Sequence, residues 1–161
     1  PLWSLFEPGS FATLANLAGK RGDLDVEKYF QGYCFHSCTA PDTNASLVEF
    51  ACQFCGEISQ IAPIFRSVAL TPGALYEAQK QIFISALEYS QTEGIRFQRD
   101  RAHLLARLAL VEHDGGELAL STQHASKAIE VAEEATQADD TYMELPQTLR
   151  RLLDAHDFDW N

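Results

Sequence analysis

All four cysteines of the 161-residue chain fall within a short stretch, and their spacing could support metal binding. They are Cys34, Cys38, Cys52 and Cys55, arranged as C-x3-C, thirteen residues, then C-x2-C. Zinc sites use paired cysteines at such spacings, because four thiolates must meet tetrahedrally around one ion. A zinc-stabilised helical domain, with Zn as its cofactor, is therefore one hypothesis for this sequence.

The same cysteines also fit an ordinary helical core without any cofactor. Unpaired cysteine is often buried and packs as a small hydrophobic residue. If residues 25–38 and 44–61 form a hairpin, the second cysteine pair lies roughly one to three helical turns beyond the first, at about 1.5 Å per residue. Four thiolates would then not converge without a bend. We therefore expect structural thiols, ahead of zinc and ahead of a disulfide or redox pair.

A basic patch stands out on this otherwise acidic chain, at Arg96, Arg99, His103 and Arg107, with Arg101 beside it. Arg96, Arg99 and His103 share one helical face, and Arg107 extends it. The simplest interpretation is ion pairing with the acidic C-terminal helices. The functional interpretation is an interaction surface for an anion or an acidic peptide.

Motifs that carry catalysis are missing from the sequence. It contains no E-x-x-H, H-E-x-x-H, G-x-S-x-G, G-x-G-x-x-G or Walker loop. This pattern favours a non-catalytic protein. A helical bundle that holds an apolar ligand between Tyr33, Phe50, Phe54 and Phe83 is a further alternative.

The charge balance limits the classes of partner. With 12 basic and 23 acidic side chains, the formal net charge is −11. An acidic surface repels phosphate backbones and anionic lipids, so we expect neither nucleic acid nor membrane as a partner. No apolar run approaches the roughly 20 residues that cross a bilayer. The N-terminus also lacks the pattern of a signal peptide, so we expect a cytoplasmic location.

Both ends of the chain are rich in aromatic residues. They are Trp3, Phe6 and Phe11 near the start and Phe158 and Trp160 near the end. Such residues either cap the core or dock on a neighbouring domain. Since the chain begins with proline, we expect either a removed initiator methionine or a piece cut from a longer protein.

Helical periodicity runs through most of the sequence. It predicts helices near 10–18, 25–38, 45–61, 72–91, 118–135 and 146–153, and one between Gly94 and about Asp114. The segment at 64–70 is either helical or extended. In the first helix, Leu14, Leu17 and Ala18 are expected to face inward. In the second, Val26, Tyr29, Phe30 and Tyr33 lie on one side. We find no strand pattern. The prediction is an all-α fold of about seven antiparallel helices in a single domain, 1–161.

The stretch from Ala102 to Ala135 predicts a closely packed helical hairpin. Its second helix carries small residues at alternating steps of three and four, and its first helix carries larger apolar residues. The second-helix set is Leu118, Ser121, Ala125, Ala128, Ala132 and Ala135, widened by Ile129 and Val131; the first-helix set is Leu104, Leu105, Leu108, Ala109 and Val111. Gly115-Gly116 forms the turn, since glycine accepts the positive φ at a helix C-terminus.

This hairpin resembles a tetratricopeptide repeat, a unit of about 34 residues. The matching positions are Leu108, Ala109, Gly116, Leu118, Ser121, Ala125 and Ala128. Glu112 and Ala125 stand where aromatic residues are common, and no proline closes the repeat. A second, partial match to the repeat pattern occurs at Leu14-Ala15 followed by Gly22-Asp23-Leu24. Its second helix does not keep the spacing of the repeat. The resemblance implies a short helical array that binds a protein or peptide, so the leading expectation is a non-catalytic scaffold or adaptor module.

Overall fold

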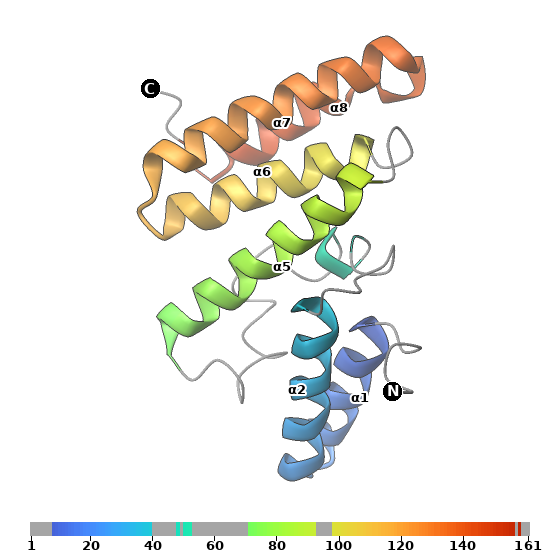
Figure 1. Cartoon of the computed structure of the whole chain (residues 1–161), viewed down its shortest axis with the longest axis vertical. Helices are drawn as coiled ribbons and strands as arrows, with labels where there is room; N and C mark the ends of the chain where they lie inside the picture. The colour runs from blue at the N-terminus through green and yellow to red at the C-terminus, as the bar shows by residue number, and fades with distance from the viewer. Residues whose placement is uncertain are drawn as a thin grey trace. The chain divides into compact units, whose positions relative to one another are not determined.

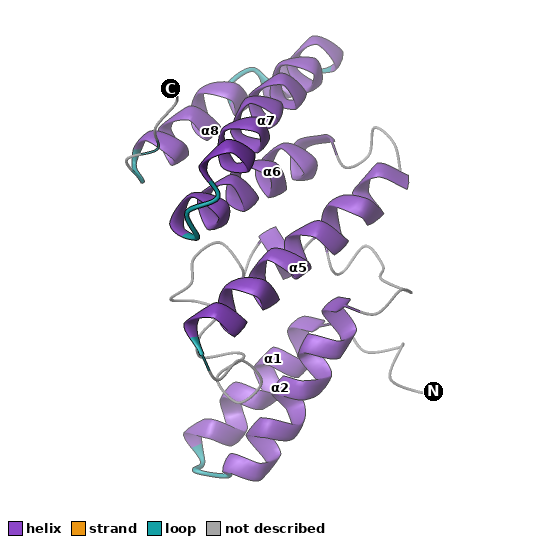
Figure 2. Ribbon diagram, turned by 60° about the vertical axis from the view of Figure 1, so that its left-hand side comes forward, coloured by secondary structure: helices purple, strands orange, loops and turns teal. Residues whose placement is uncertain are grey.

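The computed structural model describes residues 8–39, 48, 50–52, 71–92, 98–156 and 158. These residues form helices and their connections, with no strand among them, which confirms the all-α prediction (Figure 2). The elements are α1 (Pro8–Lys20), α2 (Leu24–Thr39), α5 (Pro72–Thr92), α6 (Gln98–Asp114), α7 (Leu118–Ala138), the 3-10 helix η3 (Asp140–Tyr142) and α8 (Leu145–Asp154) (Figure 1). The chain divides into two compact units, Pro1–Ala86 and Leu87–Asn161, and each is described by itself.

In the first unit, α1 and α2 form an antiparallel hairpin with a tight turn at Gly22. Gly22 has a φ of +76°, which glycine adopts without steric cost. The Asp23 N–H donates to the Ala18 carbonyl at 3.0 Å, and the Gly22 N–H donates to the Gly19 carbonyl at 3.0 Å. These two bonds define a Schellman motif, which satisfies the last carbonyls of α1 and reverses the chain.

In the second unit, α6 and α7 form a hairpin with the same turn. Gly116 has a φ of +81°. The Glu117 N–H donates to the Glu112 carbonyl at 2.8 Å, and the Gly116 N–H donates to the His113 carbonyl at 3.0 Å. The predicted turn at Gly115-Gly116 is therefore confirmed. Helix α8 packs on both α6 and α7 and buries three leucines, Leu145, Leu149 and Leu153.

The two hairpins also share one burial register. Shifting the first hairpin by the 94 positions that separate Gly22 from Gly116 aligns seven buried residues of each. The residues Phe11, Ala12, Ala15, Ala18, Glu27, Gln31 and Cys34 correspond to Leu105, Ala106, Ala109, Glu112, Ser121, Ala125 and Ala128. The residue types differ at most of these positions, which is why the sequence pattern shows only a partial match.

The small-residue face of α7 is buried as predicted. Ser121, Ala125, Ala128, Ala132 and Ala135 are buried, as are Ile129, Val131 and the predicted apolar residues of α6. Leu118 is an exception, because 57% of it is exposed and it does not belong to the inner face. It is the first residue of α7, directly after the turn.

The inner face of α1 differs from the prediction. Leu14 and Leu17 are exposed, while Phe11, Ala12, Ala15 and Ala18 are buried. The reason is close packing on α2: a Cβ added at Gly19 would lie 2.9 Å from the Glu27 carboxylate. Ala12, Ala15 and Ala18 therefore lie on the buried side of α1 together with Phe11, and the two leucines face outward.

Helix α5 begins where the sequence predicts. The Thr71 hydroxyl accepts a hydrogen bond from the Ala74 N–H at 3.1 Å, as an N-cap does. Ala78, Ile82, Phe83, Ala86 and Leu87 are buried along it. Of the helix predicted at 45–61, residues 48 and 50–52 are described and are helical; the segment 64–70 lies outside the described residues. None of the described helices combines the length and apolar character needed to cross a membrane.

Candidate interaction surfaces

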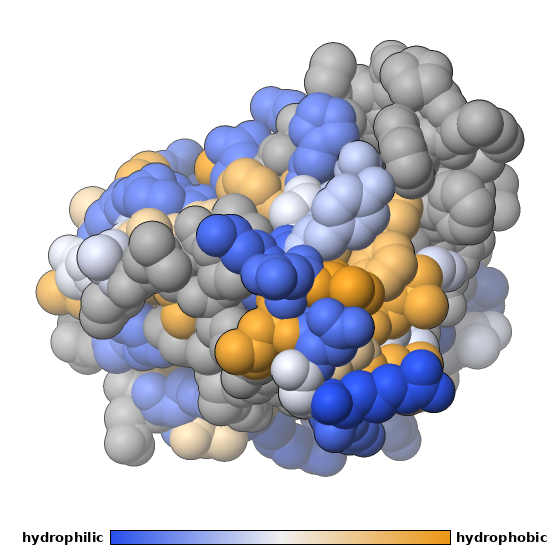
Figure 3. All heavy atoms as spheres, turned by 90° about the horizontal axis from the view of Figure 1, so that it is seen from below, coloured by the Kyte–Doolittle hydropathy of each residue, from blue (hydrophilic) through white to orange (hydrophobic). Residues whose placement is uncertain are grey.

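Four apolar residues of the first hairpin are exposed to solvent, and together we call them the hairpin face. It consists of Leu14 and Leu17 on α1 and Val26 and Tyr29 on α2, each between 39% and 51% exposed. Within each helix the two residues are three apart and therefore share a side. Figure 3, which views the molecule from the end where the α1–α2 turn lies, shows apolar side chains reaching the surface among hydrophilic ones. Contiguous exposed apolar surface is typical of binding sites.

Aromatic rings join the two helices beside the hairpin face. Phe11 of α1 stacks on Tyr33 of α2, with ring centroids 5.6 Å apart and planes at 25°. Tyr33 in turn meets Tyr29 edge to face at 4.6 Å. Hydrogen bonding to Tyr29, and then burial, raise the pKa of Tyr33. Tyr33 therefore stays neutral at physiological pH and presents an uncharged surface.

A hollow of about 470 Å³ continues from Tyr29 along α2. It is lined by Asp25, Lys28, Tyr29, Gly32, Tyr33 and His36. A Cβ added at Gly32 would meet nothing within 4 Å, so this glycine leaves the hollow open. Glycine inside a helix costs roughly 1 kcal/mol relative to alanine. The hollow is large enough to admit side chains of a partner.

The predicted basic patch lies on α6, where Arg99, His103 and Arg107 follow one another at intervals of four residues. We call these three residues the basic strip. Arg99 is exposed and the other two are partly buried. Arg96, the fourth predicted member, lies outside the described residues. Among the described carboxylates, none pairs with an arginine of α6, so the expected ion pairs to the acidic C-terminal helices are not found there.

Burial and neighbouring charge set the protonation of the strip. Burial first, and then the positive charges of Arg99 and Arg107, lower the pKa of His103 to about 4. The imidazole is therefore neutral at physiological pH. The strip carries two fixed positive charges with a neutral hydrogen-bonding ring between them.

The cysteines are only partly covered by the described residues. Cys34 is buried in α2, where it aligns with Ala128 of the second hairpin, and Cys52 is partly buried in the short helical piece at 50–52. The backbone of Cys38 belongs to α2, and Cys55 lies outside the described residues. In the part of the chain that the structure describes, no three metal-ligating side chains gather. The zinc hypothesis stays a prediction.

The apolar-ligand alternative stays a prediction, because only some of the residues proposed for it are described. Phe50 and Phe83 are buried in packed positions, and Phe54 lies outside the described residues. Tyr33 lines the open hollow on α2 instead. At the other end of the chain, Phe158 is buried and its ring lies 5.4 Å from that of His113, so this terminal aromatic residue caps the second unit.

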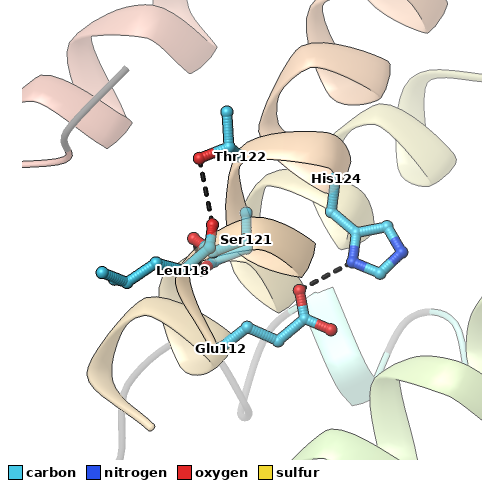
Figure 4. A network of polar contacts seen from close by, with 6 residues as sticks. Glu112, Leu118, Ser121, Thr122 and His124 are labelled. Carbon is cyan, nitrogen blue, oxygen red and sulfur yellow. Dashed lines mark hydrogen bonds and ion pairs between the residues drawn. The ribbon is translucent and has the colours of Figure 1, made fainter. Parts of the chain in front are cut away.

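A polar pair that the sequence does not reveal fastens the second hairpin (Figure 4). Glu112 of α6 is 1% exposed, and its Oε2 lies 2.7 Å from Nδ1 of His124 on α7. On the same hairpin, the Ser121 hydroxyl donates to the Ala109 carbonyl at 2.7 Å. Both contacts join residues twelve positions apart, so a helix-by-helix sequence pattern gives no sign of them. Their place under the turn gives them a structural role.

Neither known protein families, nor curated proteins, nor solved structures give a match to this chain. Its function is therefore inferred from the surfaces described above.

Proposed function

We propose that this chain is a non-catalytic helical module, similar to a tetratricopeptide-repeat scaffold or adaptor, that binds another protein through the hairpin face. The observation that carries the proposal is the outward position of Leu14, Leu17, Val26 and Tyr29. The packing of α1 on α2 buries Phe11 and three alanines of α1 and leaves these four apolar side chains partly exposed to solvent. A protein gains nothing in its own fold from such exposure, whereas a partner that covers them gains hydrophobic stabilisation.

The size of that gain fits a specific interaction. Fully burying a leucine- or valine-sized side chain contributes about 1.5–3 kcal/mol, so covering four half-exposed side chains contributes roughly 4 kcal/mol. That is nearly three factors of ten in affinity, at about 1.4 kcal/mol each. Insertion of a partner side chain into the hollow over Gly32 would add to it.

The repeated hairpin gives the proposal its architectural support. Two hairpins with the same turn and the same burial register are what a helical array uses to present an extended face. The residues of the α6–α7 hairpin that resemble a tetratricopeptide repeat belong to the second of them.

The experiment is affinity capture from a native extract with three immobilised baits: wild type, Leu17→Glu and Leu118→Glu. Leu118 is the matched control, because it is an equally exposed leucine on the other hairpin. Proteins held by wild type and by Leu118→Glu, but lost with Leu17→Glu, support the proposal. If Leu17→Glu retains every protein that wild type holds, the hairpin face is not the binding surface.

A further inference from the structure

We propose that the basic strip Arg99–His103–Arg107 is a second contact site, which binds carboxylates of an acidic protein segment. The inference rests on the proposed function, since it gives the chemistry of a further surface of the same module. It is carried by Arg99 and Arg107, which pair with no described carboxylate, by their spacing on α6 and by the charge of the chain.

Among the residues that the structure describes, Arg99 and Arg107 have no ion-pair partner, although the chain is rich in acids. Among the described residues, no carboxylate lies within ion-pair distance of Arg99 or Arg107, while Arg150 on α8 does reach Glu133 at 3.3 Å. The Nε of Arg107 is buried and has no hydrogen-bond acceptor.

The spacing of the strip defines what fits. At 1.5 Å per residue, Arg99 and Arg107 lie about 12 Å apart along α6, with His103 midway. Each guanidinium offers a planar fork of N–H donors that matches a carboxylate. The neutral imidazole between them can donate or accept one hydrogen bond without adding charge. Two carboxylates on one face of a helix, two turns apart, meet both arginines.

The charge of the whole chain favours a protein segment over a polyanion. At a formal net charge of −11, the surface repels a long phosphate backbone, whose binding depends on many basic contacts. A segment with two or three carboxylates needs only local contacts, which the strip supplies.

The test uses a fluorescein-labelled, alanine-based helical peptide with glutamates at two positions eight residues apart, and the same peptide with glutamines there. Fluorescence anisotropy is recorded against the full wild-type chain, Arg99→Gln/Arg107→Gln, and the control Arg150→Gln/Arg151→Gln. Both double variants lower the net charge equally, and the control residues lie on α8.

We expect saturable binding of the glutamate peptide by wild type and by the control, and at least about tenfold weaker binding by Arg99→Gln/Arg107→Gln, a change of about 1.4 kcal/mol or more. The proposal is overturned if both double variants lose the same amount of affinity for the glutamate peptide, or if the glutamine peptide binds as tightly as the glutamate peptide. It is also overturned if the glutamate peptide shows no saturable binding. A further contrary result is that heparin displaces the labelled glutamate peptide more effectively than an excess of the unlabelled glutamate peptide does. Leu17→Glu leaves the strip intact. If only the proposal for the basic strip is wrong, protein capture still depends on Leu17 of the hairpin face. If only the proposal for the hairpin face is wrong, the glutamate peptide still binds to the strip.

Discussion

Replacing His124 by alanine tests how the second hairpin is held together. The imidazole Nδ1 lies 2.7 Å from the Glu112 carboxylate, which is 1% exposed. Without the ring, the carboxylate stays buried on α6 and loses this partner. A buried charged group left without its partner is costly, because the protein no longer compensates for the lost hydration.

The expected cost follows from the burial of both groups. Breaking a fully buried charged pair costs about 3–5 kcal/mol, and a hydrogen bond to a charged group contributes about 1.5–3 kcal/mol. The His124 side chain is 28% exposed, so water can enter part of the space that it leaves. We therefore expect His124→Ala to lower the free energy of unfolding by about 2 kcal/mol. Glu112→Gln keeps an acceptor and should cost about 1 kcal/mol.

The assay is urea unfolding of wild type, both single variants and the double variant Glu112→Gln/His124→Ala. The double variant should be more stable than additivity allows, by about 1 kcal/mol, because each single change removes the same contact. Lys127→Ala is the control: its ion pair with Glu130 is equally short, at 2.7 Å, but exposed, and should contribute at most about 0.5 kcal/mol. A loss in His124→Ala no larger than in Lys127→Ala, or strict additivity in the cycle, would refute the reasoning.

Three other changes follow from the structure. Gly116→Ala should lower the free energy of unfolding by about 1 kcal/mol in urea titrations, because its φ is +81°; an unchanged midpoint would count against the turn. Gly19→Ala should lower the thermal unfolding midpoint of the protein, since the new Cβ meets the Glu27 carboxylate at 2.9 Å. At Gly32 a new Cβ meets open space, so Gly32→Ala should raise the thermal midpoint and increase the free energy of unfolding by about 0.5–1 kcal/mol. The pKa of His103 is lowered from 6.5 to about 4 in the folded protein. Between pH 4 and pH 6.5, the unfolded chain therefore binds a proton at His103 more readily than the folded protein does. Stability should therefore fall as pH drops from 6.5 to 4, and His103→Gln should lose that part of the slope in urea midpoints measured across this range; an identical slope would contradict the assignment.

Much of the fold follows from local signals in the sequence. Thr71 followed by proline specifies the start of α5, and Gly115-Gly116 specifies the turn after α6. These signals work because capping and positive φ depend on one or two residues and not on the rest of the molecule. The small-residue face of α7 was also predictable, since its spacing admits one buried side.

The inner face of α1 was not predictable in the same way. Leu14 and Leu17 fit a helical face as well as Ala12, Ala15 and Ala18 do, and the leucines are the more hydrophobic residues. The choice depends on α2, which packs against the side of α1 that carries Phe11 and the three alanines. The Glu112–His124 pair was hidden for a similar reason, because it joins two helices and neither helix contains its signal.

Binding through the hairpin face is the central claim, and a titration of one captured protein tests it most directly. The purified partner is titrated calorimetrically into wild type, Leu17→Glu and Leu118→Glu. We expect saturable binding with the same affinity for wild type and Leu118→Glu. For Leu17→Glu we expect binding weakened by about tenfold or more, at about 1.4 kcal/mol per factor of ten. Equal affinity for all three proteins would contradict the claim.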